Sequence, residues 1–577
     1  MTPRLTPTAS WMIWLLLGAV SGGLYALIAR LSSRFEFSQP FAERPIPAVV
    51  GLFGAAFAVY LLAAIIAARR PVGRAQLGWI AGAAIAYRLI LLPTAPIQEV
   101  DIYRYLWDGI VVSQGINPFR FPPRMVREAR FADATDRQLA RLVQIRDADP
   151  HIRALLDRVH YAELPSVYPP VSQAVFAAAA WTTPPRASIS QRALVLKIWL
   201  LAFDLGTIGL VLLMLRDTGR PLGMFVLYAW CPLAIKEFSN SGHLDVIAVF
   251  LSTLAIWLAV RMASSARSRQ DTKAKEIRWP FKPLSVRGGL ALAGSLVLAL
   301  AVGAKLYPIW LFPLFSALIW RQLGWKWVCT SAAAFSAAVI VCLWPLLPDF
   351  PAHEPERAGA DHAAEGATAV AAEDPGRGLR TFLTRWEMND FLFMLVLENV
   401  RASDAQRMGP EPWFSVVPER PREMFIGRVA ERFAYDPWQA SFVVVRLVSL
   451  IATLAVAAWC VQRALRTADV AVWLESAFLT LAWFWFLSPT LNPWYWTWML
   501  PLLVFARSRV WWGTSGVLLV YYLRFWFSYQ YSGTPVAGTP YAGAAFFDYV
   551  VTWLEFGPWL TCLTLAHVWR RYRLLSW

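Results

Sequence analysis

Long apolar runs separated by short, charged loops dominate this 577-residue chain. A helix needs about 20 mostly apolar residues to cross the hydrocarbon core of a bilayer. By that criterion the runs predict about fourteen crossings, at 11–30, 46–68, 77–93, 194–216, 222–236, 242–260, 288–304, 306–320, 327–347, 441–462, 471–488, 494–506, 510–528 and 549–569. Several runs, such as 222–236, are short, which predicts broken or tilted helices and a total of about 12–14. The pattern therefore predicts an all-α polytopic membrane protein.

Positive charges are distributed unevenly between alternate loops. If the N-terminus is cytoplasmic, the predicted inner loops, the C-terminal tail and Arg4 together hold 23 Lys and Arg residues, whereas the short outer loops hold few. Cytoplasmic loops of membrane proteins carry an excess of Lys and Arg. We therefore expect a multi-pass protein of the inner (plasma) membrane with both termini in the cytoplasm. The net charge of +16 then reflects topology rather than nucleic-acid binding.

Composition supports a membrane protein and excludes a disulfide-based fold. Apolar residues make up 57% of the chain and charged residues 16%, below the share of about 25% typical of soluble domains. All five cysteines lie inside apolar runs, without a CxxC motif or a Cys/His cluster, so we interpret them as small buried side chains. The first apolar run has no clear small-residue cleavage site after it, which predicts a retained span.

Two long segments are predicted on the outer face, and they divide the chain into five parts. These are 1–93 with three spans, the outer loop 94–193, the central bundle 194–347, the outer loop 348–440 and the C-terminal bundle 441–577. Within the first loop, the apolar stretch 171–182 predicts a helix at the membrane surface. Within the second, 352–378 has the composition of an acidic tether, and 382–400 that of an amphipathic helix. Asn389 and Asp390 of that helix are candidates for a lid.

The densest group of chemically useful side chains follows the third predicted span, in 98–123. It contains three carboxylates interleaved with aromatic and basic side chains: Glu99, Asp101, Tyr103, Arg104, Tyr105, Trp107 and Asp108. Aromatic rings stack on sugar rings, and a carboxylate near a low-dielectric interface can have a raised pKa that suits a general base. The alternative interpretation is that these are interfacial aromatics and solvated acids at the end of a span.

The string DIYRYLWDG (101–109), followed by GINPF (115–119), resembles the first outer loop of bacterial GT-C integral-membrane glycosyltransferases. The likeness is greatest to the polyprenol-phosphate-mannose-dependent mannosyltransferase-like proteins. This resemblance implies a GT-C-like helix bundle, an outer-face active site, a sugar donor carried on polyprenyl phosphate and inversion at the anomeric carbon. It also implies that Asp101 is the catalytic base, with Asp108 and then Glu99 as the next candidates.

Four further segments extend the resemblance. They are VYPPVSQ (167–173), NSGHLDV (240–246), GAKLYP (303–308) and LNPWYWTWMLP (491–501). By this resemblance and by position, the residues expected to bind the donor phosphate or sugar are Lys305, His243, Arg104, Tyr103, Trp107, Tyr168, Lys236, Asp245, Trp494 and Tyr495. For Lys305 and Lys236 the alternative is snorkelling to the interface; for His243 it is a packing histidine.

The sequence leaves metal binding open. His243 and Asp245 are two residues apart and do not share a helix face, so they are not expected to chelate one ion. The carboxylates of Asp101 and Asp108 could attract a divalent metal, but no oxygen-ligand pattern specifies one.

The sequence thus predicts an inverting glycosyltransferase that moves mannose or another hexose to an envelope glycan or glycolipid. Its other partners are membrane lipids, and no nucleic acid is expected. Two alternatives are a lipid or glycolipid transporter (flippase) and a non-catalytic envelope-assembly protein. A transporter predicts polar residues near the middle of several spans. Here the polar features gather at outer span ends, which favours surface chemistry.

Overall fold

The computed structural model describes residues 7–133, 136–264, 286–346, 376–402, 409–467 and 469–575. Within these ranges the regular structure is helical, and the extended pairing consists of two isolated bridges. The long helices are α1 (Pro7–Ser32), α2 (Ile46–Arg69), α3 (Arg74–Leu91), α9 (Ile189–Asp217), α12 (Asp245–Ser264), α13 (Val286–Ala304), α15 (Trp325–Leu343), α19 (Pro437–Arg466), α20 (Val470–Phe486) and α25 (Thr552–Leu575).

Seven helices of the described residues are long and apolar enough to cross a membrane. They are Trp11–Phe35, Ile46–Arg69, Ile189–Asp217, Asp245–Ser264, Val286–Ala304, Trp325–Leu346 and Pro437–Arg466. The prediction of an all-α multi-pass membrane protein is therefore confirmed. The other predicted crossings correspond to α3, α20 and α25, which do not meet both criteria, and to segmented helices, so the total of 12–14 stays a prediction.

The short predicted spans are segmented, as expected. The span predicted at 222–236 consists of η4 (Leu222–Phe225), α10 (Val226–Ala229), α11 (Pro232–Ile235) and the π-helical turn η5 (Lys236–Asn240). The spans at 306–320 and 494–506 consist of η7 (Tyr307–Leu311) with α14 (Phe312–Leu323), and of α21 (Pro493–Trp496) with η9 (Thr497–Phe505). The longer span at 510–528 is also segmented, into η10 (Arg509–Gly513), α22 (Thr514–Val517), η11 (Leu518–Tyr522) and α23 (Leu523–Gln530), and is followed by α24 (Gly543–Phe546) and η12 (Phe547–Val551). Proline lacks the backbone donor of a helix interior. Pro232 and Pro493 accordingly begin new helices, and Pro501 lies inside a 3₁₀ stretch.

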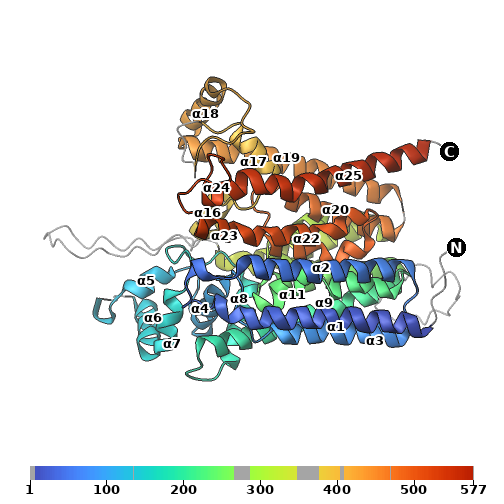
Figure 1. Cartoon of the computed structure of the whole chain (residues 1–577), viewed down its shortest axis with the longest axis horizontal. Coiled ribbons are helices and arrows are strands. Elements are labelled where there is room, and N and C mark those ends of the chain that lie inside the picture. Colours follow the sequence, from blue (N-terminus) through green and yellow to red (C-terminus); the bar gives the residue numbers. More distant parts are fainter. Residues whose placement is uncertain are drawn as a thin grey trace.

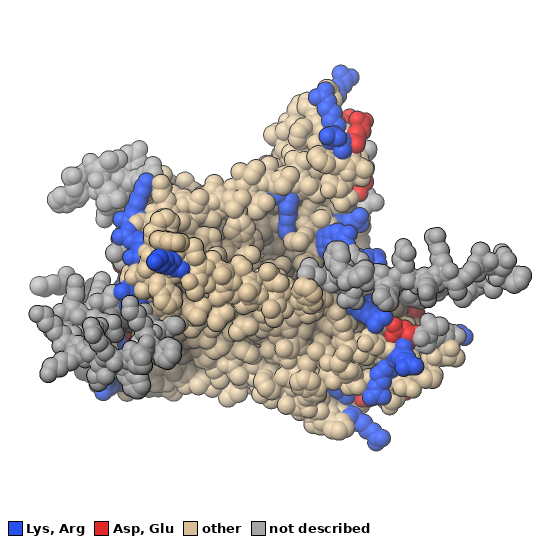
Figure 2. Space-filling model, turned by 180° about the vertical axis from the view of Figure 1, so that it is seen from behind, with Lys and Arg blue, Asp and Glu red and all other residues tan. Residues whose placement is uncertain are grey.

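The long helices run side by side along the longest axis of the molecule (Figure 1). The start of α1 and the end of α25 lie at one end, and the outer-loop helices gather at the other. These are α4 (Asp101–Ser113), α5 (Pro123–Glu128), α6 (Arg137–Ala148), α7 (Pro150–Asp157), α8 (Pro170–Thr182), α16 (Arg377–Arg385), α17 (Leu392–Glu398) and α18 (Glu419–Phe433). Figure 2 shows the molecule from behind. Charged side chains lie at both ends of the face seen there, and the belt between them is almost uncharged, as expected for a surface in contact with lipid.

Segment 382–400 differs from the prediction of one amphipathic helix. It contains the end of α16, then an extended stretch, then α17. In the stretch, the Met388 N–H donates to the Pro489 carbonyl at 2.9 Å and the Leu491 N–H donates to the Met388 carbonyl at 3.0 Å. Asn389 and Asp390 are buried beside this bridge and lie between the two helices, not on one, so their predicted position on a helix is wrong and their role as a lid stays a prediction. Most of the predicted tether at 352–378 lies outside the described residues.

A buried ion pair fastens the helices beneath the outer end. Arg88 of α3 donates to the Asp204 carboxylate of α9 with 2.6 Å between Nε and Oδ2, and Tyr228 of α10 donates to the same carboxylate at 2.7 Å. All three side chains are buried. Charges inside a membrane protein are costly unless they are paired. Asp204, an acid in the middle of a predicted span, is accordingly fully paired.

Candidate active site

Helix α4 begins at the candidate base because Glu99 holds its first turn. The Glu99 Oε1 atom accepts hydrogen bonds from the backbone N–H groups of Val100 at 2.9 Å and Asp101 at 3.1 Å. An acceptor at a helix N-terminus satisfies donors that have no partner within the helix. The Asp101 side chain is left half-buried at the start of α4.

The loop that leads into α4 is fixed by the π-helical turn η5. The Asn240 Oδ1 atom accepts from the Ile97 N–H at 2.9 Å, and its Nδ2 atom donates to Thr94 Oγ1 and the Ala95 carbonyl, both at 2.8 Å. Lys197 of α9 donates to the Thr94 carbonyl at 2.8 Å. Single π-helical turns are frequent at functional sites. Here the turn sets the position of Glu99 and Asp101 relative to the central bundle.

A buried network of alternating charges lies behind Asp101. The Nε2 atom of His243 is 3.1 Å from Glu99 Oε2 and 3.3 Å from Glu237 Oε2. Lys236 Nζ is 3.3 Å from the same Glu237 oxygen and donates to Tyr522 Oη at 2.7 Å. Tyr522 in turn hydrogen-bonds Glu237. Buried charges need partners of opposite sign, and the two carboxylates here face an imidazole and an ammonium group.

The two acids at the start of α4 have opposite protonation behaviour. Burial raises the pKa of Asp101 to about 6, and the neighbouring Glu99 carboxylate contributes to the rise. Burial is the largest single influence and acts to raise the pKa of Glu99, but His243, Lys236 and the Asp101 N–H together outweigh it and the pKa falls to about 2. Environments that push the pKa values of paired groups apart are typical of acid–base sites. Glu99 is therefore a fixed negative charge, and Asp101 is suited to exchange a proton near neutral pH.

Lys305 lies at the end of α13 in a cage of one carboxylate and two aromatic rings. Its Nζ atom is 2.8 Å from Asp245 Oδ1 and 4.4 Å from the centroid of the Tyr495 ring. The Trp498 indole donates to the same Asp245 oxygen at 2.6 Å. Asp245 is fully buried, whereas the Lys305 side chain keeps 18% of its surface exposed. The ammonium group is thus positioned by the protein while remaining accessible to an anion.

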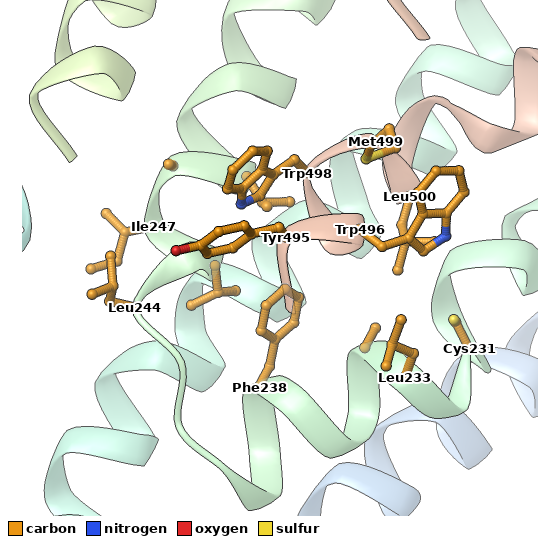
Figure 3. Packing of buried hydrophobic residues seen from close by; sticks show 14 of the residues in the cluster. Cys231, Leu233, Phe238, Leu244, Ile247, Tyr495, Trp496, Trp498, Met499 and Leu500 are labelled. Atoms are coloured by element: carbon orange, nitrogen blue, oxygen red, sulfur yellow. The ribbon is translucent and has the colours of Figure 1, made fainter. Parts of the chain in front are cut away.

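Aromatic residues of the segment 493–498 contact both basic side chains of the site, His243 and Lys305. Trp494 stacks on the His243 ring with 4.4 Å between centroids, and Tyr495 stacks on Trp498 at 4.5 Å. Figure 3 shows Tyr495 and Trp498 on one side of this segment and Trp496 on the other. His243 contacts Glu99 while Asp245 contacts Lys305; Asp245 begins α12, and His243 lies just before it.

Several residues predicted for the site instead support it from behind. Asp108 is buried, and its carboxylate accepts from Arg104 Nε at 2.9 Å, Ser166 Oγ at 2.5 Å and Gln173 Nε2 at 3.0 Å. Trp107, Tyr103 and Lys236 are also buried. The structure thus separates these side chains from the accessible surface beside Asp101, although their expected roles remain predictions.

A cleft open to solvent adjoins Asp101. It is shallow and is lined by Asp101, Arg104, His160, Tyr161, Leu164, Pro165, Val167, Tyr168 and Trp386. The lining residues do not include Lys305, His243 or Trp494. The cleft and these two basic side chains therefore lie in different parts of the surroundings of Asp101.

Sequence reasoning missed Glu237, Tyr522, Tyr161 and Trp386. The signal for Glu237 was present, because a Lys–Glu pair interrupts an otherwise apolar run at 222–238. Nothing in the sequence indicates that Tyr522 meets Glu237, since 285 positions separate them. Among the described residues, no group of three or more His, Cys, Asp or Glu side chains is arranged to hold a metal ion.

Residues 9–322 match a family model described as alpha-(1->6)-mannopyranosyltransferase, N-terminal domain. This match spans more than half of the chain and contains Asp101, His243 and Lys305. The chain belongs to this family. The mannosyltransferase resemblance of the outer-loop motif is thereby confirmed, and the protein is a membrane glycosyltransferase that acts on mannose. No curated protein and no solved structure matches the chain.

Proposed function

We propose that this mannosyltransferase moves mannose from a polyprenyl-phosphate donor to a glycan or glycolipid acceptor at the outer face of the plasma membrane, with Asp101 as the general base. The observation that carries the proposal is the position of Asp101. Its carboxylate has a pKa raised to about 6 and lines a cleft open to solvent. Nearby, buried carboxylates hold two candidate cations in place: Glu99 holds His243, and Asp245 holds Lys305.

The transfer requires one proton acceptor and one site for phosphate. Asp101 takes the proton from an acceptor hydroxyl, and the hydroxyl oxygen attacks the anomeric carbon from the face opposite the donor phosphate. The bond between that carbon and the phosphate oxygen breaks, and the lipid phosphate leaves with the electron pair. A single base is sufficient because phosphate leaves without protonation, unlike the leaving groups of glycosidases that use a carboxylate pair.

Lys305 is the candidate for the phosphate contact. A partly exposed ammonium group at the end of a span binds phosphate as a point charge. His243 is enclosed by Glu99, Glu237 and the Trp494 ring, so its position is fixed. It contributes positive charge to the site from that position. Trp494, which is half-buried, then offers aromatic surface for the donor sugar, whereas Tyr495 is buried beneath it against Lys305 and Trp498.

Topology supports an outer-face site. The outer-loop helices lie opposite the start of α1 and the end of α25 (Figure 1). The inner loops predicted from the sequence carry the excess of Lys and Arg. The charged residues Arg88 and Asp204 within the bundle are paired with each other and do not form a polar pathway, which favours surface chemistry over transport.

The test is transfer by purified protein in proteoliposomes, with labelled polyprenyl-phosphate mannose and a synthetic mannoside acceptor. We expect Asp101→Asn to lower the rate about 10²–10⁴-fold, the usual contribution of a general base. Asp157→Asn makes the same change on an exposed residue of α7 and is expected to leave the rate unchanged. Normal transfer by Asp101→Asn would exclude Asp101 as the base.

A further inference from the structure

We propose that the cleft beside Asp101 binds the acceptor saccharide, and that Trp386 and Tyr161 form the aromatic walls on which an acceptor pyranose stacks. This rests on the proposed role of Asp101 as base. It adds a ligand site in which Trp386 comes from outside residues 9–322, the part of the chain that the family model covers.

The cleft combines the exposed ring of Tyr161 and the half-buried ring of Trp386 with fixed polar groups. Tyr161 and Trp386 lie with 4.8 Å between ring centroids, and His160 stacks on Tyr161 at 4.1 Å. Tyr161 is 41% exposed and has a φ of +49°, an uncommon conformation for a residue with a bulky side chain. Such strained conformations cluster at functional sites. The exposed ring therefore has a structural cost that a ligand-binding role explains.

The polar side of the cleft matches a sugar edge. Arg104 is held by Asp108 and by the Leu164 carbonyl at 3.0 Å, so its guanidinium is fixed where it lines the cleft. Aromatic faces carry partial negative charge and attract the polarised C–H groups of a pyranose face. Binding sites of this kind combine an apolar wall with a few fixed polar groups.

Trp386 is held in place from both sides. Helix α16, which precedes it, packs so closely on the 165–167 segment that a Cβ atom on Gly378 would lie 2.5 Å from the Pro165 carbonyl oxygen. After Trp386, Met388 is hydrogen-bonded to residues 489 and 491, directly before the segment that carries Trp494. The same strand-like connection therefore joins the wall of the cleft to the proposed donor side.

The cleft accounts for attack by a primary hydroxyl. The family description specifies an alpha-(1->6) mannosyl linkage, and the 6-hydroxyl of a mannopyranose projects beyond the ring. A pyranose stacked on the open side of the Trp386–Tyr161 pair can therefore direct this hydroxyl toward Asp101 while the rest of the glycan extends to solvent.

The experiment separates acceptor binding from donor binding and from chemistry. An octyl α-1,6-dimannoside serves as the acceptor probe, with the full chain in nanodiscs. We expect Trp386→Ala to raise the KM for the dimannoside about tenfold, with less than a twofold change in the KM for polyprenyl-phosphate mannose. Trp386→Phe is expected to retain most of the affinity. The control, Trp320→Ala, removes an exposed tryptophan of α14 and should change neither constant.

Direct binding of the dimannoside, measured by saturation-transfer NMR, makes the result independent of turnover. Loss of this binding in Trp386→Ala and Tyr161→Ala, with thermal unfolding unchanged, supports the acceptor site even if the polyprenyl-phosphate donor proves wrong. Unchanged dimannoside binding and KM in both variants would overturn it. A rise in the donor KM alone would also overturn it, because the cleft would then belong to the donor.

Discussion

Replacing Glu99 by Gln tests whether Asp101 or its neighbour is the base. Glutamine keeps an oxygen for the Val100 and Asp101 N–H groups but removes a negative charge that helps to raise the pKa of Asp101 from 3.8 to about 6. Burial is the larger cause and stays. We therefore expect the pKa of Asp101 to fall toward its ordinary value; a fall of about one unit, to about 5, corresponds to about 1.4 kcal/mol.

The sign of the pH effect follows from the role of the base. Asp101 acts only when ionised, so the wild-type rate should fall about tenfold per pH unit below pH 6 and level off above it. At pH 5 a base with a pKa of about 6 is about one-tenth ionised, and one with a pKa of about 5 is half ionised. Glu99→Gln should therefore be about fivefold faster than wild type at pH 5, relative to each plateau.

The assay is kcat/KM for the dimannoside between pH 4.5 and 8, at saturating donor. Glu36→Gln, a carboxylate change on an exposed residue of the loop before α2, is the control and should keep the wild-type profile. An acid limb that stays in place or moves to higher pH in Glu99→Gln would refute the electrostatic reasoning. Complete loss of activity at all pH values would transfer the role of base to Glu99.

Three further substitutions test the surrounding groups. Lys305→Gln should raise the donor KM at least about tenfold, with partial rescue by Lys305→Arg, because it removes the proposed phosphate contact and leaves Asp245 without its cation; an unchanged donor KM would contradict this. Asp108→Asn should lower the free energy of unfolding by about 1–3 kcal/mol by weakening the bonds to Arg104 and Ser166, and loss of kcat without loss of stability would instead indicate a catalytic role. Gly109→Ala should destabilise the protein by about 1–3 kcal/mol in thermal unfolding, because its Cβ would lie 2.4 Å from a backbone oxygen of α8; a neutral effect would refute the close packing of α4 on α8.

The sequence by itself determined the class of protein. Hydropathy responds to the bilayer, which acts on each apolar run locally, so the long helices and the segmented nature of the short ones could be predicted. Asp101 is the candidate base because its motif is contiguous, and that role stays a prediction. The single helix predicted at 382–400 was wrong, since the backbone around Met388 pairs with residues 489–491 instead of with its own helix.

Only the tertiary structure decided how the surroundings of the carboxylates differ. Asp101 and Asp108 are both on α4 and within one contiguous motif, but Ser166 and Gln173 enclose Asp108 while Asp101 faces a cleft. Their partners come from distant parts of the chain, as does Trp386. Burial and electrostatic interactions depend on which helix ends converge, and no local pattern encodes that convergence.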